Sequence, residues 1–339
     1  MRKFLALIAI LAAVSAGLAQ AEEGKLSGKV YFNYNHDFSD RGGSYNGQSN
    51  GFNFTRIYFG YDKDLDADFS IRFLMDVDNT KDDNGKSAWR PFMKNAYLSM
   101  NCKLIPGSKW YFGMVGMPFV SVPESHWGYR SLAQMATDKQ GWGSTADLGV
   151  GWKGKWQDQF QIEFAVANGA GYKNPEADMF KLIELRPTAF LLEKALTLSA
   201  FLSYETQAAD SNSFIFSALA GYEHQLFRIG GEYSMRSVSA ATDGAEDVSG
   251  NNISLWGVFN ATDKLNLLAR YDMYEPNADV DADKSALIVA GLDFHPIKNV
   301  RFIPNVQIQT FEADDDANTA AVDESKPINT AYVTFEYSW

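Results

Sequence analysis

Segments of about ten residues recur along the chain in which apolar and polar residues alternate with a period of two, the pattern of strands with one apolar face. The clearest runs span residues 68–77, 160–167, 227–236 and 265–273. No stretch keeps a convincing helical period of 3.6 residues for long. The alternation predicts an all-β protein, but a soluble two-sheet sandwich and a membrane barrel share it. The connections between the strands therefore have to decide between these two architectures.

The connections alternate in length. We expect sixteen strands, at residues 25–37, 52–63, 65–78, 93–103, 108–117, 146–156, 158–168, 180–190, 194–206, 213–224, 225–237, 251–261, 263–275, 285–295, 298–311 and 328–339. Every second connection is a tight turn, as at Asp64, Gln157 and Thr262, and the others are long and polar, at 38–51, 79–92, 118–145, 169–179, 207–212, 238–250, 276–284 and 312–327. This rhythm is typical of outer-membrane barrels, and a sandwich has no reason to lengthen every second connection. The sequence thus predicts a transmembrane antiparallel β-barrel of about 16 strands, with short periplasmic turns and long extracellular loops.

The last segment alternates down to the final residue. Its apolar face carries Ala331, Val333, Phe335, Tyr337 and Trp339, and polar residues occupy the other face. An apolar face that ends in an aromatic ring suits a lipid-facing strand with its ring at the membrane interface. By itself the pattern would also fit an edge strand of a soluble sandwich. With the loop rhythm, we expect Trp339 to end the sixteenth strand, which pairs with residues 25–37 and closes the barrel.

The N-terminal segment has the pattern of a secretory signal peptide. Arg2 and Lys3 precede an apolar run over residues 4–13, and Ala19-Gln20-Ala21 forms a small-residue cleavage site. The apolar run is too short for a membrane anchor. We expect cleavage after Ala21, and because no linker follows, residues 22–339 are expected to form one barrel domain in the outer membrane.

The charge balance narrows the range of partners. The chain has 30 Lys and Arg against 42 Asp and Glu, a formal net charge of -12 at pH 7. We therefore expect no nucleic-acid partner, because that binding depends on basic patches. Acidic residues gather in expected extracellular loops, at 243–247, 279–283 and 312–316. They predict either a negative vestibule, or divalent ions bridging the loops to lipopolysaccharide, or ordinary solvated surface.

No catalytic or metal-binding pattern is present. Residues 279–283 lack the Gly and the distal Glu of an EF-hand loop. The single cysteine, Cys102, allows no intrachain disulfide and is expected to fill space on a strand. The histidines, His36, His126, His224 and His295, are scattered without metal spacing, and no G-x-S-x-G motif exists. We expect no enzyme activity, no cofactor and no metal.

The whole chain after Ala21 resembles a sixteen-stranded Gram-negative porin in its alternation, its loop rhythm and its terminal Trp339. The segment Gly-Met-Val-Gly-Met-Pro-Phe at 113–119, followed by Glu124, Trp-Gly-Tyr-Arg at 127–130 and Ala-Asp-Leu-Gly-Val at 146–150, is similar to the phosphate-selective-porin-like group. Members named for phosphate carry lysine ladders in the pore, and this chain has none, so phosphate selectivity is not implied. The resemblance implies a porin for passive diffusion of small hydrophilic solutes and ions, with Trp339 as the signal to the barrel assembly machinery.

A barrel of this size encloses a water-filled lumen, so its selectivity depends on what narrows that lumen. In general porins the loop between strands five and six folds inward, and the resemblance implies the same for residues 118–145. The candidate constriction residues are Glu124, His126, Arg130, Asp138 and Lys139. A surface flap that packs under other loops is the alternative. We also expect a short helix over 129–136.

The opposite wall would come from the inward faces of strands, because an arginine on the lipid face near the midplane costs about 2–4 kcal/mol. The candidate wall residues are Arg56, Arg72, Arg186, Arg228, Arg236, Arg270 and Arg301. Lys29, Asp68, Asp76, Glu163, Glu184, Glu232, Asp272 and Glu336 are expected on the same inner face. Such mixed rings of charge set ion selectivity. The alternative for each arginine is a structural pair, such as Arg228 with Glu232.

Two rival functions stay open at this level. One is a solute-specific channel, for sugars or anions, of the same architecture. The other is a structural or adhesive barrel with a plugged lumen. The physiological solute and the choice between a monomer and a homotrimer are not decided by the sequence.

Overall fold

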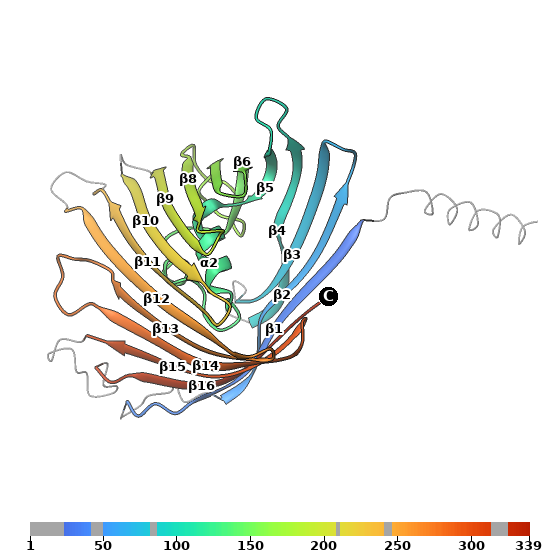
Figure 1. Ribbon diagram of the computed structural model, residues 1–339. Coiled ribbons are helices and arrows are strands. Elements are labelled where there is room, and N and C mark those ends of the chain that lie inside the picture. The colour runs from blue at the N-terminus through green and yellow to red at the C-terminus, as the bar shows by residue number, and fades with distance from the viewer. Residues whose placement is uncertain (1–23, 42–49, 82–86, 208–210, 241–245, 313–324) are drawn as a thin grey trace, which may run out of the picture.

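The protein is a closed antiparallel barrel of sixteen strands (Figure 1). The computed structural model describes residues 24–41, 50–81, 87–207, 211–240, 246–312 and 325–339. Each strand pairs with its neighbours in sequence, and β1 (Lys25–Asp37) pairs with β16 (Ile328–Ser338) to close the sheet. The predicted strand number and topology are therefore confirmed. The expected signal peptide, residues 1–21, lies outside the described residues.

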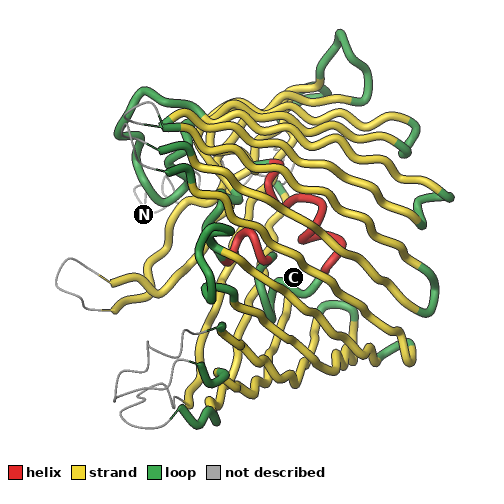
Figure 2. Tube along the Cα trace, turned by 90° about the vertical axis from the view of Figure 1, so that its left-hand side faces the viewer, coloured by secondary structure: helices red, strands yellow, loops and turns green. Residues whose placement is uncertain are grey.

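Most strands start and end within a few residues of the expected positions. The others are β2 (Asn50–Asp64), β3 (Phe69–Lys81), β4 (Ser87–Asn101), β5 (Ser108–Gly116), β6 (Ala146–Trp156), β7 (Phe160–Ala167), β8 (Leu182–Leu191), β9 (Leu196–Thr206), β10 (Asn212–Glu223), β11 (Phe227–Val238), β12 (Val248–Thr262), β13 (Leu265–Glu275), β14 (Ser285–Ile297) and β15 (Val300–Phe311). Figure 2 shows their short turns at one rim and the long loops at the other. In the part of the chain described, no helix combines the length and the apolarity needed to cross a bilayer.

Two expected strand starts were wrong, for identifiable reasons. β3 begins at Phe69 and not at 65, because Asp66 Oδ1 accepts hydrogen bonds from the backbone N–H groups of Asp68 and Phe69 at 2.8 and 2.7 Å. That arrangement holds a turn in place of a strand. β4 begins at Ser87 and not at 93, and it contains Pro91. Proline is tolerated there because β5 pairs with β4 only from Ala96 onward, which leaves this part of β4 as an edge.

The barrel has an apolar outside and a polar inside, as the alternation predicts. On β11, Tyr233 and Met235 are exposed on the outer surface, whereas Glu232 and Ser234 between them are buried. The same inversion recurs on β13, where Tyr271 is exposed and Asp272 is buried. Buried polar side chains must be covered by something inside the barrel, because a wide empty lumen would leave them solvated.

Register shifts interrupt four strand pairs of the described sheet, and two of them lie in the neighbouring pairs β1–β2 and β3–β4. Tyr31 lies opposite Arg56 but Phe32 lies opposite Phe54, so Thr55 is an extra residue on β2. Likewise Leu74 faces Asn95 and Met75 faces Met93, so Lys94 is the extra residue on β4. A bulge shifts the alternation by one residue and re-aims the side chains beyond it.

The connection between β5 and β6 lies inside the barrel. It contains η1 (Pro118–Val120), α2 (Ser121–Trp127) and α3 (Ala136–Lys139), which Figure 2 shows in red within the strands. The helix expected over 129–136 was wrong. Pro123 is accepted in the first turn of α2, where N–H groups lack helical partners, and Gly128 ends that helix in the left-handed region at φ 73°.

Candidate functional site

The inward loop, residues 117–145, is docked on the inner wall of the barrel. Its apolar side chains Phe119, Trp127, Tyr129 and Met135 are almost completely buried. They belong to one hydrophobic cluster with wall residues of β7 to β15, and the rings of Phe119 and Phe201 lie 5.7 Å apart. The core of this protein therefore lies between the loop and one side of the wall.

Four of the seven arginines expected on the wall bind backbone carbonyls of this loop. Arg186 donates from Nε to Pro118 at 2.7 Å and from Nη2 to Phe119, Arg228 to Trp127 at 3.0 Å, Arg270 to Ala133 at 3.5 Å, and Arg301 to Gly128 at 3.2 Å. The last carbonyls of a helix have no partner within it, so the donors from Arg228 and Arg301 satisfy the end of α2 and complement its dipole. Arg228 thus contacts the loop and not Glu232, the partner suggested by the sequence.

Three of these guanidinium groups also lie over aromatic rings. Arg270 lies 5.2 Å from the ring centre of Trp127, Arg301 lies 4.2 Å from that of Tyr129, and Arg186 lies 4.7 Å from that of Phe201. Such cation–π contacts gain strength when water is excluded. Arg186 and Arg270 are only 1% and 2% exposed, so their inward orientation serves the docking of the loop.

Carboxylates of the wall complete the attachment by accepting from loop donors. Glu184 accepts from the backbone N–H of Phe119 at 3.1 Å, Glu163 from Ser121 Oγ at 2.5 Å, Asp293 from the Tyr129 hydroxyl at 3.0 Å, and Glu336 from Ser131 Oγ at 2.9 Å. The attachment points run from β7 round to β16. They leave β1 to β5 facing the free side of the loop.

His126, one of the predicted constriction residues, lies in the docked face. Its Nδ1 accepts a hydrogen bond from the indole N–H of Trp256 at 3.0 Å, and the side chain is buried. Burial, together with the positive charge of Arg228, lowers the pKa of His126 to about 4. The ring also packs against Gly221, where an added Cβ atom would clash with Nε2. His126 therefore acts as an uncharged part of the packing.

Three of the predicted constriction residues come together on the free side of the loop. Arg130 Nη1 lies 2.5 Å from Glu124 Oε2 and 2.7 Å from Asp138 Oδ2, and the Arg130 side chain is 6% exposed. Gln134 also donates to Asp138 at 3.0 Å. Lys139 has an exposed side chain and forms no ion pair with the other described residues, so it stands apart from this cluster.

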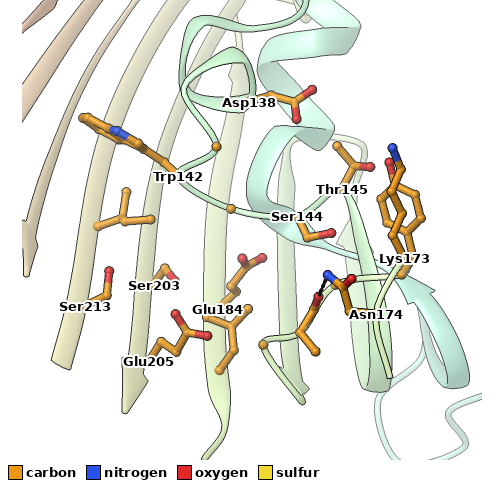
Figure 3. A pocket seen from close by; sticks show the side chains of 18 of the residues that line it. Asp138, Trp142, Ser144, Thr145, Lys173, Asn174, Glu184, Ser203, Glu205 and Ser213 are labelled. Carbon is orange, nitrogen blue, oxygen red and sulfur yellow. Dashed lines mark hydrogen bonds between the residues drawn. The ribbon is translucent and has the colours of Figure 1, made fainter. Parts of the chain in front are cut away.

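Among the cavities between the described residues of the lumen, four large ones are linked because each shares lining residues with the next. The outer one, of about 400 Å³, lies between the loop and the wall, with Asp138, Trp142 and Ser144 on one side and Glu184, Ser203, Glu205 and Ser213 on the other (Figure 3). Thr145 is shared with a second cavity of about 460 Å³, which shares Arg130 with a third of about 490 Å³. Arg72 connects the third with a cavity of about 1050 Å³ beside the short turns.

The other three expected wall arginines line these cavities. Arg56 is paired with Asp76 at 2.6 Å, Arg72 with Asp62 at 2.9 Å, and Arg236 donates to Ser213 Oγ at 3.3 Å. Arg56 and Arg236 border the outer cavity, and Arg72 borders both the third cavity and the one beside the short turns. The fixed charges along the cavities are thus largely paired across neighbouring strands.

Opposite the loop, Lys94 and Tyr31 line both middle cavities and Tyr58 lines the third, and none of the three was among the predicted site residues. Lys94 was missed because simple alternation places it with Leu98 on the outer face, and the bulge turns it inward. A signal existed: Lys94 and Asn95 are adjacent polar residues that break the alternation.

Comparisons with known proteins rest on structure. No family model matches the chain, and neither does any curated protein sequence. The barrel is similar to OprB of Pseudomonas putida, with 10% identity over 96% of each chain and a TM-score of 0.69. It is also similar to an anion-selective porin from Comamonas acidovorans, with 13% identity over 94% of this chain and 99% of that one and a TM-score of 0.66. A trimer form of the outer membrane protein OmpT of Vibrio cholerae matches over 94% and 99%, with 13% identity and a TM-score of 0.64. The chain therefore has the sixteen-stranded barrel fold of the outer-membrane porins.

Proposed function

We propose that this chain is an outer-membrane porin, a channel for passive diffusion of small hydrophilic solutes and ions. The observation that carries the proposal is the docked loop: it fills one side of the lumen and leaves polar cavities beside it, three along β1 to β5 and the outer one mainly against β8 to β11. Passive diffusion needs a continuous water-filled path in which the charged side chains of the lining are accessible to the solute. The chain would reach the outer membrane through a signal peptide, residues 1–21, cleaved after Ala21.

In this proposal the constriction is formed by Glu124, Arg130 and Asp138 on the loop, whereas His126 holds the docked face and Lys139 lies apart from the cluster. The facing wall carries Tyr31, Arg56 and Lys94. Basic groups on the wall opposite carboxylates on the loop create a field across the pore, which orients dipolar solutes as they pass. No catalytic role is proposed for these groups.

Conductance in a planar bilayer tests the channel. The purified full-length barrel should give discrete open-channel steps, whereas a barrel plugged for a structural or adhesive role would give none. Deleting residues 121–141 and joining the ends with a short Gly/Ser linker should raise the single-channel conductance, because the loop occupies much of the lumen. Unchanged conductance in that variant would mean that the current does not pass beside the loop.

The assembly state is a further part of the proposal. One structural relative, OmpT of Vibrio cholerae, exists in a trimer form, and we infer a homotrimer for this chain as well. The acidic loop at 279–283 is largely exposed and suits contacts with divalent ions between lipopolysaccharide molecules, while 241–245 and 313–324 lie outside the described residues. Analytical ultracentrifugation in detergent would separate a trimer from a monomer.

A further inference from the structure

We propose that Lys94 forms a binding site for small monocarboxylates where the two middle cavities of the channel meet. The inference rests on the proposed channel function and names a solute class for it. The chain as a whole is acidic, with a net charge of -12, yet basic residues outnumber acidic ones in the lining of both middle cavities. Among the described residues, the third cavity is lined by Lys29, Arg72, Lys94 and Arg130, against Glu124 as its one acidic residue.

Lys94 differs from the other cations because no carboxylate of the described residues lies within ion-pair distance of it. Its Nζ lies 3.5 Å from the Tyr58 hydroxyl, and the ring centres of Tyr58 and Tyr172 are 5.2 and 5.5 Å away. Lys94 is 9% exposed and borders both middle cavities. A nearly buried ammonium group without a counter-ion is costly, so an anion that enters the cavity gains a charge-assisted hydrogen bond.

The neighbouring cations are already neutralised, which limits the charge of the solute. Arg56 is paired with Asp76, Arg130 with Glu124 and Asp138, and Lys29 lies 3.5 Å from Glu336. Lys94 therefore contributes one uncompensated positive charge. A dianion such as hydrogen phosphate would carry a second negative charge, next to Glu124, that no cation neutralises. The single charge of a carboxylate monoanion is neutralised by Lys94.

The inward orientation of Lys94 is set by the pairing of β4 with β3. The bulge at Lys94 on β4 and the bulge at Thr55 on β2 both lie on the free side of the loop, and each sets the inward orientation of a cation. Tyr31 and Tyr58 flank the site in an edge-to-face pair, with ring centres 6.0 Å apart. The hydroxyl of Tyr58 can donate to the second carboxylate oxygen, and the rings offer apolar surface to the rest of the solute.

The experiment compares wild type with Lys94→Gln, Lys94→Arg and Lys109→Gln in planar bilayers. Lys109 is the matched control, because it is an exposed lysine that lines the fourth cavity, the one of about 1050 Å³ beside the short turns. Benzoate is the probe, added to a KCl solution at neutral pH while the chloride current is recorded. The wild type should show saturable block, and Lys94→Gln should raise the half-blocking concentration about tenfold or more, the size expected for a lost charge-assisted hydrogen bond. In a KCl gradient, Lys94→Gln should also move the reversal potential toward cation preference.

Lys94→Arg should keep the block, and Lys109→Gln should behave as wild type. Block by benzoate that is unchanged in Lys94→Gln would overturn the inference, and so would stronger block by inorganic phosphate than by benzoate. Absence of any channel current in the wild type would instead remove the proposed function. Altered electrophoretic mobility of unheated Lys94→Gln would reveal misfolding. In that case the half-blocking concentration of benzoate is compared between Lys94→Arg and Lys109→Gln.

Discussion

The indole N–H of Trp256 on β12 donates a hydrogen bond to Nδ1 of His126, 3.0 Å away in the inward loop. An acceptor at Nδ1 requires the neutral ring with its proton on Nε2, and that Nε2 atom is buried without a hydrogen-bond partner among the described residues. A second proton on the ring would remove the acceptor. This one contact therefore couples the docking of the loop to the charge of a histidine.

Acid should loosen the docked loop in a defined pH window. The pKa of His126 is lowered to about 4 in the docked loop, against an ordinary value of 6.5, so the undocked state binds the proton more readily. Docking stability from this group is complete above pH 6.5, falls as the pH drops toward 4, and changes no further below that. The loss is on the order of 3 kcal/mol. Open-channel noise recorded between about pH 7 and 4 should increase with acidity.

The variant His126→Phe provides the control for this effect. It keeps a ring in the packed site but cannot take up a proton, so the part of the pH dependence between 6.5 and 4 should disappear. The same noise profile in wild type and variant would contradict the role of His126.

Loss of a docking arginine should destabilise the loop more than loss of a lumen arginine. Arg228→Met removes the donor to the Trp127 carbonyl and is expected to cost about 1–3 kcal/mol of docking stability, since that buried carbonyl loses a charged partner. Limited proteolysis in detergent should then cut within residues 117–145. Arg236→Met, which removes an arginine bound to Ser213 and not to the loop, should be cut no faster than wild type.

Arg130 should set the charge of the constriction. Arg130→Gln leaves Glu124 and Asp138 without their shared counter-ion in a region of low exposure. We expect a shift of the reversal potential toward cations in a KCl gradient, together with a destabilisation of the docked loop, because two carboxylates lose the cation between them. The double variant Glu124→Gln with Arg130→Gln should restore much of the wild-type potential. An unchanged potential in the single variant would place the ion path elsewhere.

Trp339 should be needed for closing the barrel. Its backbone exchanges hydrogen bonds with Gly28 on β1, at 3.2 and 3.1 Å, and its indole covers Gly28 so closely that an added Cβ there would clash with the ring. Deletion of Trp339 should reduce the folded, heat-modifiable species in outer-membrane fractions while secretion continues. Gly28→Val should have a similar effect, whereas Gly51→Val, at a position with open space, should not. Normal insertion without Trp339 would make it only an interfacial anchor.

The strands were predictable because each depends on local information. In an outer-membrane barrel one face of every strand contacts lipid and the other contacts water or the loop. Each strand therefore shows the alternation of apolar and polar residues in its own sequence. Phe160, Gln161 and Glu163 illustrate this, since the apolar residue is exposed and the two polar ones are buried. The errors fell where another interaction competed, as at the turn held by Asp66 and at the edge position of Pro91.

The sequence by itself determined the barrel, the order of its strands, the alternation of its rims and the inward face of its arginines. Only the tertiary structure decided what those arginines do, because their partners are carbonyls of a loop far away in sequence: Arg301 and Gly128 are joined only when the loop enters the lumen. The same holds for Lys94, whose orientation depends on a bulge in its pairing with β3. Contacts such as that of Arg301 with Gly128 form only when the loop enters the closed sheet, so the pattern of a single strand does not assign them.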